Sequence, residues 1–373
     1  MANQFNQFLS AYQQLRSARH DAVLATVIET MGSTYQKAGA RMLISRDGEF
    51  TGLLGGGCFE ADLGEQAASV FEDRQSKVIF YDMRSPEDEI WGLGLGCNGA
   101  VRVLLQYLSI ENNFSPLNDI VAALEHIQTG VLATVCESNH QDYPVNQSLF
   151  FQATKQEGQL VLTKEHEIHA TPARRVLLQN KTILVKHYIN DKHITVFYDL
   201  IEPALRLLVL GAGPDAVPVT QFAKSLGWYV SVIDHRSAYI KPERFPDVDQ
   251  LLNIVPVELN EKLALDQFDA LVLMTHSIDY DERYLKIIAD SHIPYIGLLG
   301  PAKRRDRLLD TIGQQAEKIK GRVYGPTGLD IGAKTPQEIA LSIMAEIQAV
   351  LANRDGRQLC QQALPIQERE LTN

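Results

Sequence analysis

Residues 206–216 read RLLVLGAGPDA, an apolar run that ends in two closely spaced glycines. A short apolar run bounded by glycine indicates a buried strand. Gly211 permits the tight turn that leaves such a strand, and Gly213 lets the backbone come close to a ligand. Ala216 is small enough for the next helix to pack closely on the strand. The segment therefore predicts a strand, a glycine turn and a helix in succession.

The sequence that follows continues this alternation of strands and helices. A second strand, YVSVID, ends at Asp234, where an acidic side chain can bind the hydroxyl pair of a ribose. Apolar strands follow at 270–275 and 295–300, and a helix is predicted over 336–351 because Thr335 and Glu338 form a capping box. Such alternation is typical of right-handed βαβ units. We therefore predict a Rossmann-like, doubly wound parallel sheet.

The ligand of this glycine turn stays open on the sequence alone. NAD(P) or another nucleotide would place a phosphate on the free amides at the start of the helix. Pro214 contributes no amide, however, and Asp215 would repel a phosphate. The basic cluster at 303–305 is either an anion site or a solvated helix face.

The chain before about Ile201 has a different pattern, rich in strands and poor in helices. We predict an α+β domain over residues 1–203, a Rossmann-like domain over 204–356 and a polar tail over 357–373. The class is therefore α/β. The tetrapeptide LATV occurs at 24–27 and again at 132–135, each time after a helix-like stretch. This repetition reflects either chance or a duplicated unit.

Two glycine–cysteine segments, GGGCFE and GLGLGCNG, mark this first half. Consecutive glycines before a helix expose amides that suit an oxyanion or a phosphate. A cysteine at a helix N-terminus holds more thiolate, which is a soft metal ligand or a nucleophile. The candidate site residues in these segments are Gly55, Gly56, Gly57, Cys58, Glu60, Gly96 and Cys97.

Simpler interpretations of the same residues remain open. Either cysteine alone is as compatible with a small buried residue, and Glu60 is placed either to cap the loop or to handle a proton. The TMGST stretch with Arg41 is either an anion site or an ordinary turn. His166 and His169 have i,i+3 spacing, but no further ligand accompanies them, so we expect them at the surface, together with His235, His276 and His292.

Composition excludes several classes of protein. The chain has 373 residues with 35 basic and 46 acidic side chains, and its net charge of −11 disfavours a nucleic-acid or membrane partner. No apolar run reaches the ~18 residues of a membrane helix, and the polar N-terminus lacks the pattern of a signal peptide, so we expect a cytoplasmic protein. The four cysteines form no CxxC pair, which argues against a zinc site or a disulfide scaffold.

Taken together, these motifs resemble the XdhC/CoxI family of xanthine dehydrogenase accessory proteins. The resemblance spans about residues 20–350 and rests on ATVIETMGSTYQKAGARMLISRDGEFTGLLGGGCFE, GLGLGCNGAVRVLL, GAGPDA with IDHR, YIGLLGPAKRR and GPTGLDIGAKTPQEIALSI, in this order. The family pattern carries over to the site residues named above and to Gly211, Gly213 and Asp234. Ala216 stands where many relatives have glycine.

The resemblance implies a cofactor-binding chaperone rather than a catalyst. Such a protein binds the molybdenum cofactor, a molybdopterin, and helps deliver it to an apo-molybdoenzyme of the xanthine dehydrogenase type. Cys58 is then a candidate contact to molybdenum, and the cofactor sulfuration machinery is a candidate partner. Amphipathic helices at both ends are compatible with a homodimer.

Two other functions remain open. One is an NAD(P)-dependent oxidoreductase that uses Gly211, Gly213 and Asp234, with His276 as the available proton donor. The other is a non-catalytic scaffold that holds a partner enzyme.

Overall fold

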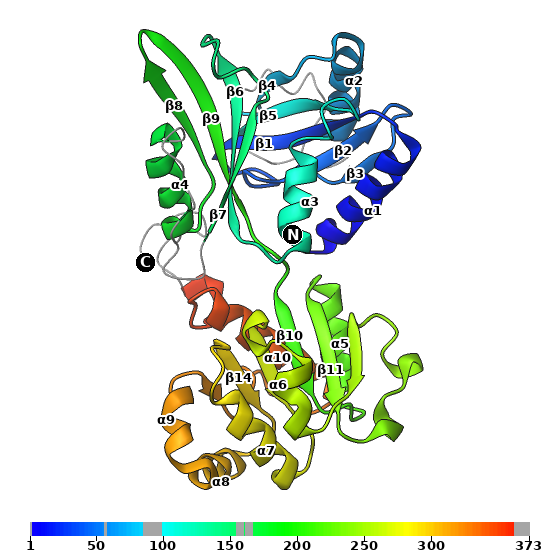
Figure 1. Cartoon of the computed structure of the whole chain (residues 1–373), viewed down its shortest axis with the longest axis vertical. Helices are drawn as coiled ribbons and strands as arrows, with labels where there is room; N and C mark the ends of the chain where they lie inside the picture. Colours follow the sequence, from blue (N-terminus) through cyan, green and yellow to red (C-terminus); the bar gives the residue numbers. More distant parts are fainter. Residues whose placement is uncertain (1, 56–57, 85–98, 154–159, 161–166, 362–373) are drawn as a thin grey trace. The chain divides into compact units, whose positions relative to one another are not determined.

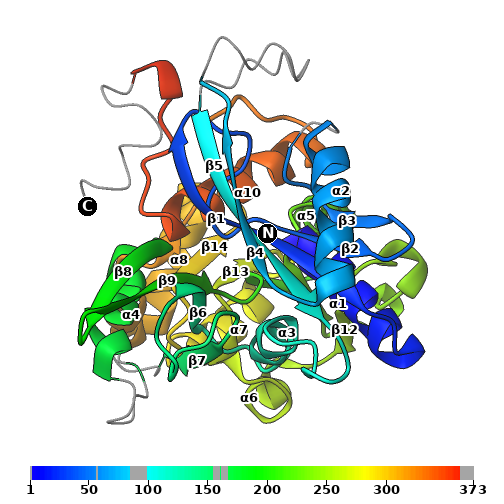
Figure 2. The same cartoon turned by 90° about the horizontal axis from the view of Figure 1, so that it is seen from above.

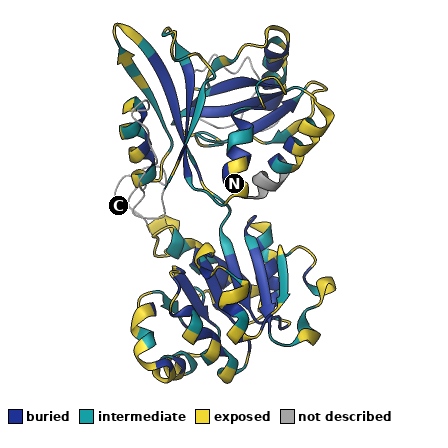
Figure 3. Cartoon of the chain, in the orientation of Figure 1, coloured by how far each residue is buried: buried dark blue, intermediate teal, exposed yellow. Residues whose placement is uncertain are grey.

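The computed structural model describes residues 2–55, 58–84, 99–153, 160 and 167–361. The chain divides into two compact units, with the boundary between Pro203 and Ala204 (Figure 1). Each unit has its own sheets and its own buried apolar clusters, and the buried residues concentrate on the strands (Figure 3). Among the described residues, no helix is both long and apolar enough to cross a membrane.

The first unit begins with an antiparallel sheet ordered β3-β2-β1-β5-β4. Its strands are β1 (Ala22–Gly32), β2 (Arg41–Ser45), β3 (Phe50–Gly52), β4 (Lys77–Asp82) and β5 (Gly99–Leu108). Helix α2 (Cys58–Asp73) covers one face because its apolar residues recur at helical spacing: Phe59, Leu63, Ala67 and Val70. Helix α1 (Ala2–Ala18) buries Phe8 and Tyr12 in a separate cluster with β1 residues Ala22 and Leu24.

A second antiparallel sheet in the same unit is ordered β7-β6-β9-β8. It consists of β6 (Gly130–Ser138), β7 (Ser148–Gln152), β8 (Ile183–Ile189) and β9 (Lys192–Ile201), and helix α3 (Leu117–Glu125) precedes it. Helix α4 (Glu167–Gln179) lies against β8 and β9 (Figures 1 and 2). The sequence pattern did not predict α4.

The two sheets repeat one topology. In each, a helix leads into a central strand, a neighbouring strand follows, a second helix covers the sheet, and two further strands complete it on the other side. The central strands β1 and β6 carry LATV at the same register. Each has a β-bulge, between Val27 and Glu29 in β1 and between Val135 and Glu137 in β6. Of the two interpretations of the LATV echo, the structure supports a duplicated unit; residues 2–108 are called the first repeat and 117–201 the second repeat.

The repeats contact each other through matching positions. Gln106 on β5 pairs with Leu24, and Asp199 on β9 pairs with Leu132, so the two residues are equivalent. The Gln106 side chain donates a hydrogen bond to Asn146 of the second repeat. Asp199 in turn accepts a hydrogen bond from Arg41 of the first repeat. The two contacts thus start from equivalent residues but differ in chemistry, with a neutral pair on one side and an ion pair on the other.

The second unit contains a parallel sheet ordered β12-β11-β10-β13-β14-β15. The strands are β10 (Arg206–Leu210), β11 (Tyr229–Asp234), β12 (Gln250–Asn253), β13 (Ala270–Leu273), β14 (Tyr295–Leu298) and β15 (Val323–Tyr324). The chain order reverses between β10 and β13, which is the topological switch point where such sheets bind ligands. The predicted Rossmann-like sheet is confirmed, although the short edge strands β12 and β15 were not anticipated.

Helices cover both faces of this sheet. Alternate residues of β10 point to opposite sides: Val209 packs with α5 (Ala216–Ser225) and α10 (Pro336–Leu351), and Leu208 packs with α7 (Ile278–Ile288) and α8 (Ala302–Ile312). Short helices α6 (Leu259–Lys262) and α9 (Ala316–Ile319) complete the connections. The capping box predicted for the last helix is present, because Thr335 and Glu338 bond reciprocally.

Candidate functional site

The first glycine–cysteine segment runs into the start of α2. Gly55 is buried, and a Cβ at this position would lie only 2.7 Å from the Cβ of Phe59, so the close approach of loop and helix requires glycine. Helix α2 begins at Cys58. Gly56, Gly57 and the side chain of Cys58 lie outside the described residues.

Glu60 holds this loop in place. Its side chain is buried, and Oε1 accepts hydrogen bonds from the backbone N–H groups of Leu54 at 3.0 Å and Gly55 at 2.6 Å. Bonds of this kind offset the cost of burying a carboxylate, and the first turn of a helix also favours negative charge. Of the two roles considered for Glu60, these bonds match the capping role.

The second glycine–cysteine segment joins β4 to β5 at the same corner of the sheet. Gly96 and Cys97 lie outside the described residues. On either side of the connection, the N–H of Met83 donates to the Gly99 carbonyl at 3.0 Å. On β4, Tyr81 contacts the ring of Phe59 with centroids 4.8 Å apart and donates a 2.5 Å hydrogen bond to Asp62 of α2. The start of α2 is therefore fixed beside the strand ends that carry this segment.

Tyr81 acts as a permanent hydrogen-bond donor at this corner. Burial and the hydrogen bond to the Asp62 carboxylate both raise the pKa of its phenol far above the ordinary value. The proton therefore stays on Tyr81 under all physiological conditions, and the link between α2 and β4 does not depend on pH in that range.

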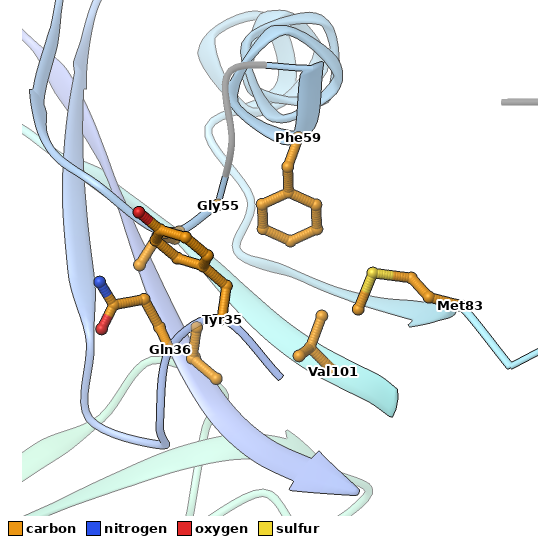
Figure 4. A pocket seen from close by; sticks show the side chains of 8 residues that line it. Tyr35, Gln36, Gly55, Phe59, Met83 and Val101 are labelled. Carbon is orange, nitrogen blue, oxygen red and sulfur yellow. The ribbon is translucent and has the colours of Figure 1, made fainter. Parts of the chain in front are cut away.

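A pocket lies where the flanks of the two segments meet (Figure 4). It is lined by Val27, Tyr35, Gln36, Leu54, Gly55, Phe59, Met83 and Val101, and it is a small hollow that is partly open to solvent. Gly55 belongs to the flank of the first segment, and Met83 belongs to the flank of the second. The structure thus brings the described ends of both predicted segments to one hollow.

The lining of this pocket is mostly apolar and aromatic. Tyr35 and Phe59 offer ring faces, Met83 offers a polarisable thioether, and Gln36 offers both hydrogen-bond donors and acceptors. A few polar groups in an apolar hollow are typical of a small-molecule site. The lining suits a flat, partly apolar ring.

Arg41 does not contribute to this site. Its guanidinium forms an ion pair with the buried carboxylate of Asp199 and donates to the Gly39 carbonyl at 3.1 Å. Thr182 also donates to Asp199, at 2.9 Å. These contacts place Arg41 in the interface between the repeats, where its charge is neutralised.

The predicted glycine turn of the second unit has the expected backbone. Gly211 has φ +120°, and a Cβ there would lie 2.4 Å from the Met274 carbonyl oxygen, so the turn passes close to the end of β13. At Gly213 a Cβ would lie 2.6 Å from Oδ1 of Asp215 and 3.6 Å from the ring of His276. The turn is therefore crowded by side chains of the protein itself.

Asp234 is completely buried and already bonded within the protein. Its carboxylate accepts from the Ala212 N–H at 2.8 Å and from the N–H and guanidinium of Arg236 at 2.8–2.9 Å. Burial works to raise the pKa of Asp234, but the bonds from Arg236 and Ala212 outweigh it and hold the pKa below the ordinary value. A ribose at this position would have to share these oxygens.

An acid–imidazole pair stands at the switch point. Nε2 of His276, which follows β13, lies 2.7 Å from Oδ2 of Asp215, the residue before α5. His276 has φ +61°, a conformation that costs free energy in a residue other than glycine. Oδ1 of Asp215 is buried with no hydrogen-bond partner among the described residues. A carboxylate thus occupies the helix start where a dinucleotide would place its phosphate.

The basic cluster after β14 is engaged internally. Arg304 donates to the buried carboxylate of Asp281 at 2.6 Å, and Arg305 donates to the Gly325 carbonyl at 2.5 Å. Two of the three cations therefore hold α7 and the loop after β15, which neither interpretation of the cluster anticipated.

Two histidines expected at the surface are covered by other side chains instead: His169 is buried, and the side chain of His235 is only 10% exposed. His169 is 2% exposed and lies in a cluster with Tyr198 and His187, and His235 stacks on Tyr280 with ring centroids 3.4 Å apart. His276 and His292 are exposed as expected, with side-chain exposures of 56% and 89%, and His166 lies outside the described residues. Among the described residues, no group of three or more His, Cys, Asp or Glu side chains could hold a metal ion.

Comparison with known protein families identifies both units. Residues 15–82 match the model of the XdhC and CoxI family, and residues 207–347 match that of the XdhC Rossmann domain. The first match ends in β4, and the second covers the parallel sheet and most of α10.

Individual relatives extend over nearly the whole chain. A protein from Bacillus subtilis named as a probable subunit of xanthine dehydrogenase is 34% identical over 91% of this chain and 96% of its own length. The molybdenum cofactor insertion chaperone PaoD from Escherichia coli is 21% identical over 90% of this chain and 85% of its own length. A crystal structure described as a xanthine dehydrogenase from Bacillus halodurans superposes with a TM-score of 0.72 and 27% identity, covering 95% of this chain and 98% of the other.

Both units, the order of their elements and the extent of these matches agree with the resemblance found in the sequence. The protein belongs to the XdhC and CoxI family.

Proposed function

We propose that this chain binds the molybdenum cofactor as cargo and assists the maturation of a molybdoenzyme of the xanthine dehydrogenase type. The observation that carries the proposal is the pocket bordered by the flanks of both glycine–cysteine segments. The names of two relatives, one a molybdenum cofactor insertion chaperone and the other a probable part of xanthine dehydrogenase, support the same role.

The chemistry of the segments suits this cargo. Molybdopterin is anionic through its phosphate and its dithiolene, so it needs amide donors. Gly56 and Gly57 are the candidates, because the Gly55 N–H already bonds to Glu60. Cys58 and Cys97 supply soft sulfur ligands, and we assign the contact to molybdenum to Cys58. Glu60 keeps the loop in the conformation that presents the amides. Gly96 allows a close approach on the side of Cys97.

Delivery sets limits on how the cargo is held. A carrier that binds its cargo too tightly cannot release it, because transfer to the client requires a comparable affinity. We propose an apo-molybdoenzyme as the client, the cofactor sulfuration machinery as a second partner, and a homodimer working in the cytoplasm. Size-exclusion chromatography with light scattering tests the dimer, and affinity purification from cells tests the partners.

Cofactor retained on purification tests the central proposal. The full chain is purified under reducing conditions, and bound molybdopterin is oxidised to its fluorescent form A derivative and quantified. We expect the wild type to carry pterin and Cys58→Ala to lose most of it, since a glycine-flanked thiolate is removed. Cys360→Ala is the matched control because Cys360 is an exposed free cysteine outside both segments.

Two results would contradict this function. One is wild-type protein without pterin above background in repeated preparations. The other is equal pterin content in Cys58→Ala, Cys97→Ala and the Cys360→Ala control, which would remove the thiols from the site.

The nicotinamide-dependent oxidoreductase is the weaker alternative. The pair of Asp215 and His276 would provide a proton donor beside the turn, but the same Asp215 carboxylate opposes the pyrophosphate of NAD(P). Fluorescence titration with NADH and NADPH separates the two functions. Binding below millimolar concentration would revive the oxidoreductase, and we expect none.

A further inference from the structure

Comparison of the two repeats singles out Tyr35. The loops β1–β2 and β6–β7 start in the same way, with paired backbone bonds between Val27 and residues 39–40 and between Val135 and residues 146–147. Each loop places a tyrosine eight residues after that valine, Tyr35 in the first repeat and Tyr143 in the second. The first loop is one residue longer, however. The Ala40 N–H donates to the Lys37 carbonyl as the Gln147 N–H donates to the Pro144 carbonyl, so Tyr35 lies one position before the equivalent of Tyr143.

Their surroundings differ. Tyr143 packs on its own repeat: its ring centroid lies 6.4 Å from that of His169 in the first turn of α4 and 5.2 Å from that of His140. Tyr35 instead is 59% exposed, and it lines the pocket opposite Met83 (Figure 4). Tyr143 thus packs against the helix start in the second repeat, whereas Tyr35 borders an open hollow in the first.

The wall of this hollow at the helix start is rigid. Phe59 is 5% exposed, and its ring is held by the contact with Tyr81, which Asp62 anchors in turn. The Tyr35 loop is tied down beside its ring, because Thr34 donates a 2.8 Å hydrogen bond to the Gln36 carbonyl. A flat ligand entering the hollow meets a fixed aromatic wall at Phe59 and an exposed ring at Tyr35.

We propose that Tyr35 binds a planar heteroaromatic ring by stacking, with Phe59 as the buried wall and the Gln36 amide bonding to the ring edge. The proposal rests on the proposed function, under which that ring is the pterin of the cargo. Stacking on an aromatic side chain buries both apolar faces, and a pterin edge offers donors and acceptors that an amide matches.

Titration with a free pterin tests this assignment directly. The probe is 6-carboxypterin, whose fluorescence is quenched when it stacks on an aromatic ring, and the protein is the full chain. We expect Tyr35→Ala to weaken binding about tenfold, the size typical of losing one base–aromatic stack. Tyr35→Phe keeps the ring and binds like the wild type. Tyr188→Ala, which removes a 76% exposed tyrosine of the second repeat, also binds like the wild type.

The outcomes separate this inference from the proposed function. If wild type and Tyr35→Ala bind the probe equally or not at all, the stacking role is wrong, whether or not cofactor co-purifies. If no cofactor co-purifies but the probe binds and Tyr35→Ala weakens it, the pocket is a planar-ring site and the cargo is wrong. Because Tyr35 is exposed, an unchanged thermal midpoint in Tyr35→Ala distinguishes lost stacking from lost folding.

Discussion

The two repeats of the first unit share a fold but not their connections. In the second repeat, β8 passes directly into β9 through Asn190 and Asp191, both with positive φ, as in the tightest hairpins. In the first repeat, the same connection takes residues 83–98 and includes Gly96 and Cys97. The second repeat shows that the sheet itself needs only two residues here.

The residues at the start of the covering helices, α2 and α4, also differ between the two repeats. In the first repeat, GGGC precedes α2, and Glu60 bonds back to the loop. In the second repeat, α4 begins at Glu167 with a histidine in its first turn, and that histidine is buried against Tyr198. One copy of the duplicated unit thus has a filled interior, while the other combines extra glycines and cysteines with an open pocket. Sequence that the fold does not need is available for binding.

Replacing the long connection by the short one should have the largest effect. In this variant, Arg84–Asn98 are exchanged for Asn-Gly, so that Met83 and Gly99 flank a two-residue turn as Ile189 and Lys192 do in the second repeat. We expect the sheet to fold, because a shorter loop costs less closure entropy. Retained pterin should fall to background, because Cys97 and its glycines are gone.

A change of the turn between β8 and β9 in the second repeat is the control. Asn190-Asp191 are replaced by Gly-Asn, which also forms a tight turn, and this variant should keep wild-type pterin content. If the shortened first repeat kept its pterin while circular dichroism showed an intact fold, the long connection would have no part in binding.

The sequence predicted the alternating strands and helices of the second unit better than it predicted the duplication in the first unit. Strand, glycine turn and helix follow each other locally around Gly211, so short-range patterns determine them. In the central strands the duplication left LATV and a glutamate two residues later, Glu29 and Glu137, in common. The cores of the repeats otherwise need apolar volume rather than identical residues. The duplication is visible in the strand order and in the matching bulges, which depend on pairing between distant segments.

Side-chain contacts across long distances were the least predictable. Arg41 has the pattern of an anion site, yet its partner Asp199 lies 158 residues further along the chain. Tyr35 gave no signal at all, because its role depends on a comparison with Tyr143 in three dimensions. Asp234 was correctly placed at the end of its strand, but the bonds from Ala212 and Arg236 could not be anticipated from a spacing rule.

The next largest effect should be a difference in unfolding free energy between variants at the two equivalent positions of the contact between the repeats. Asp199→Ala leaves the largely buried Arg41 guanidinium without its carboxylate, and breaking a buried ion pair costs about 3–5 kcal/mol. Gln106→Ala at the equivalent position removes one neutral hydrogen bond to Asn146 and should cost about 1–2 kcal/mol. Urea unfolding of both variants measures the difference.

A double variant refines this prediction. Arg41→Met combined with Asp199→Leu removes both charges, so it should recover much of the stability lost in Asp199→Ala. Equal losses in Asp199→Ala and Gln106→Ala would mean that the two halves of the interface are energetically alike, despite their different chemistry.

The smallest effect should be a difference in acid sensitivity between equivalent strand positions. Tyr81 on β4 pairs with Val101, and His187 on β8 pairs with Ile194, so they occupy matching sites. Burial lowers the pKa of His187 below its ordinary value, while burial and Asp62 raise that of Tyr81. In the unfolded chain His187 titrates near ~6.5. Below that pH the unfolded state binds the proton more readily than the folded state. The contribution of His187 to the free energy of unfolding is therefore complete above about pH 6.5 and is lost as the pH drops.

His187→Phe should remove this part of the acid sensitivity. The variant loses the 2.8 Å hydrogen bond to Tyr198, so it is less stable than the wild type at pH 7.5. Between pH 7.5 and pH 5.5, however, its free energy of unfolding should fall less than that of the wild type, because one proton-binding difference is gone. Tyr81→Phe is the matched variant in the first repeat and should keep the wild-type slope, since Tyr81 binds no proton in this range. Identical slopes for wild type and His187→Phe would place the acid sensitivity elsewhere, and the two positions would then differ in packing alone.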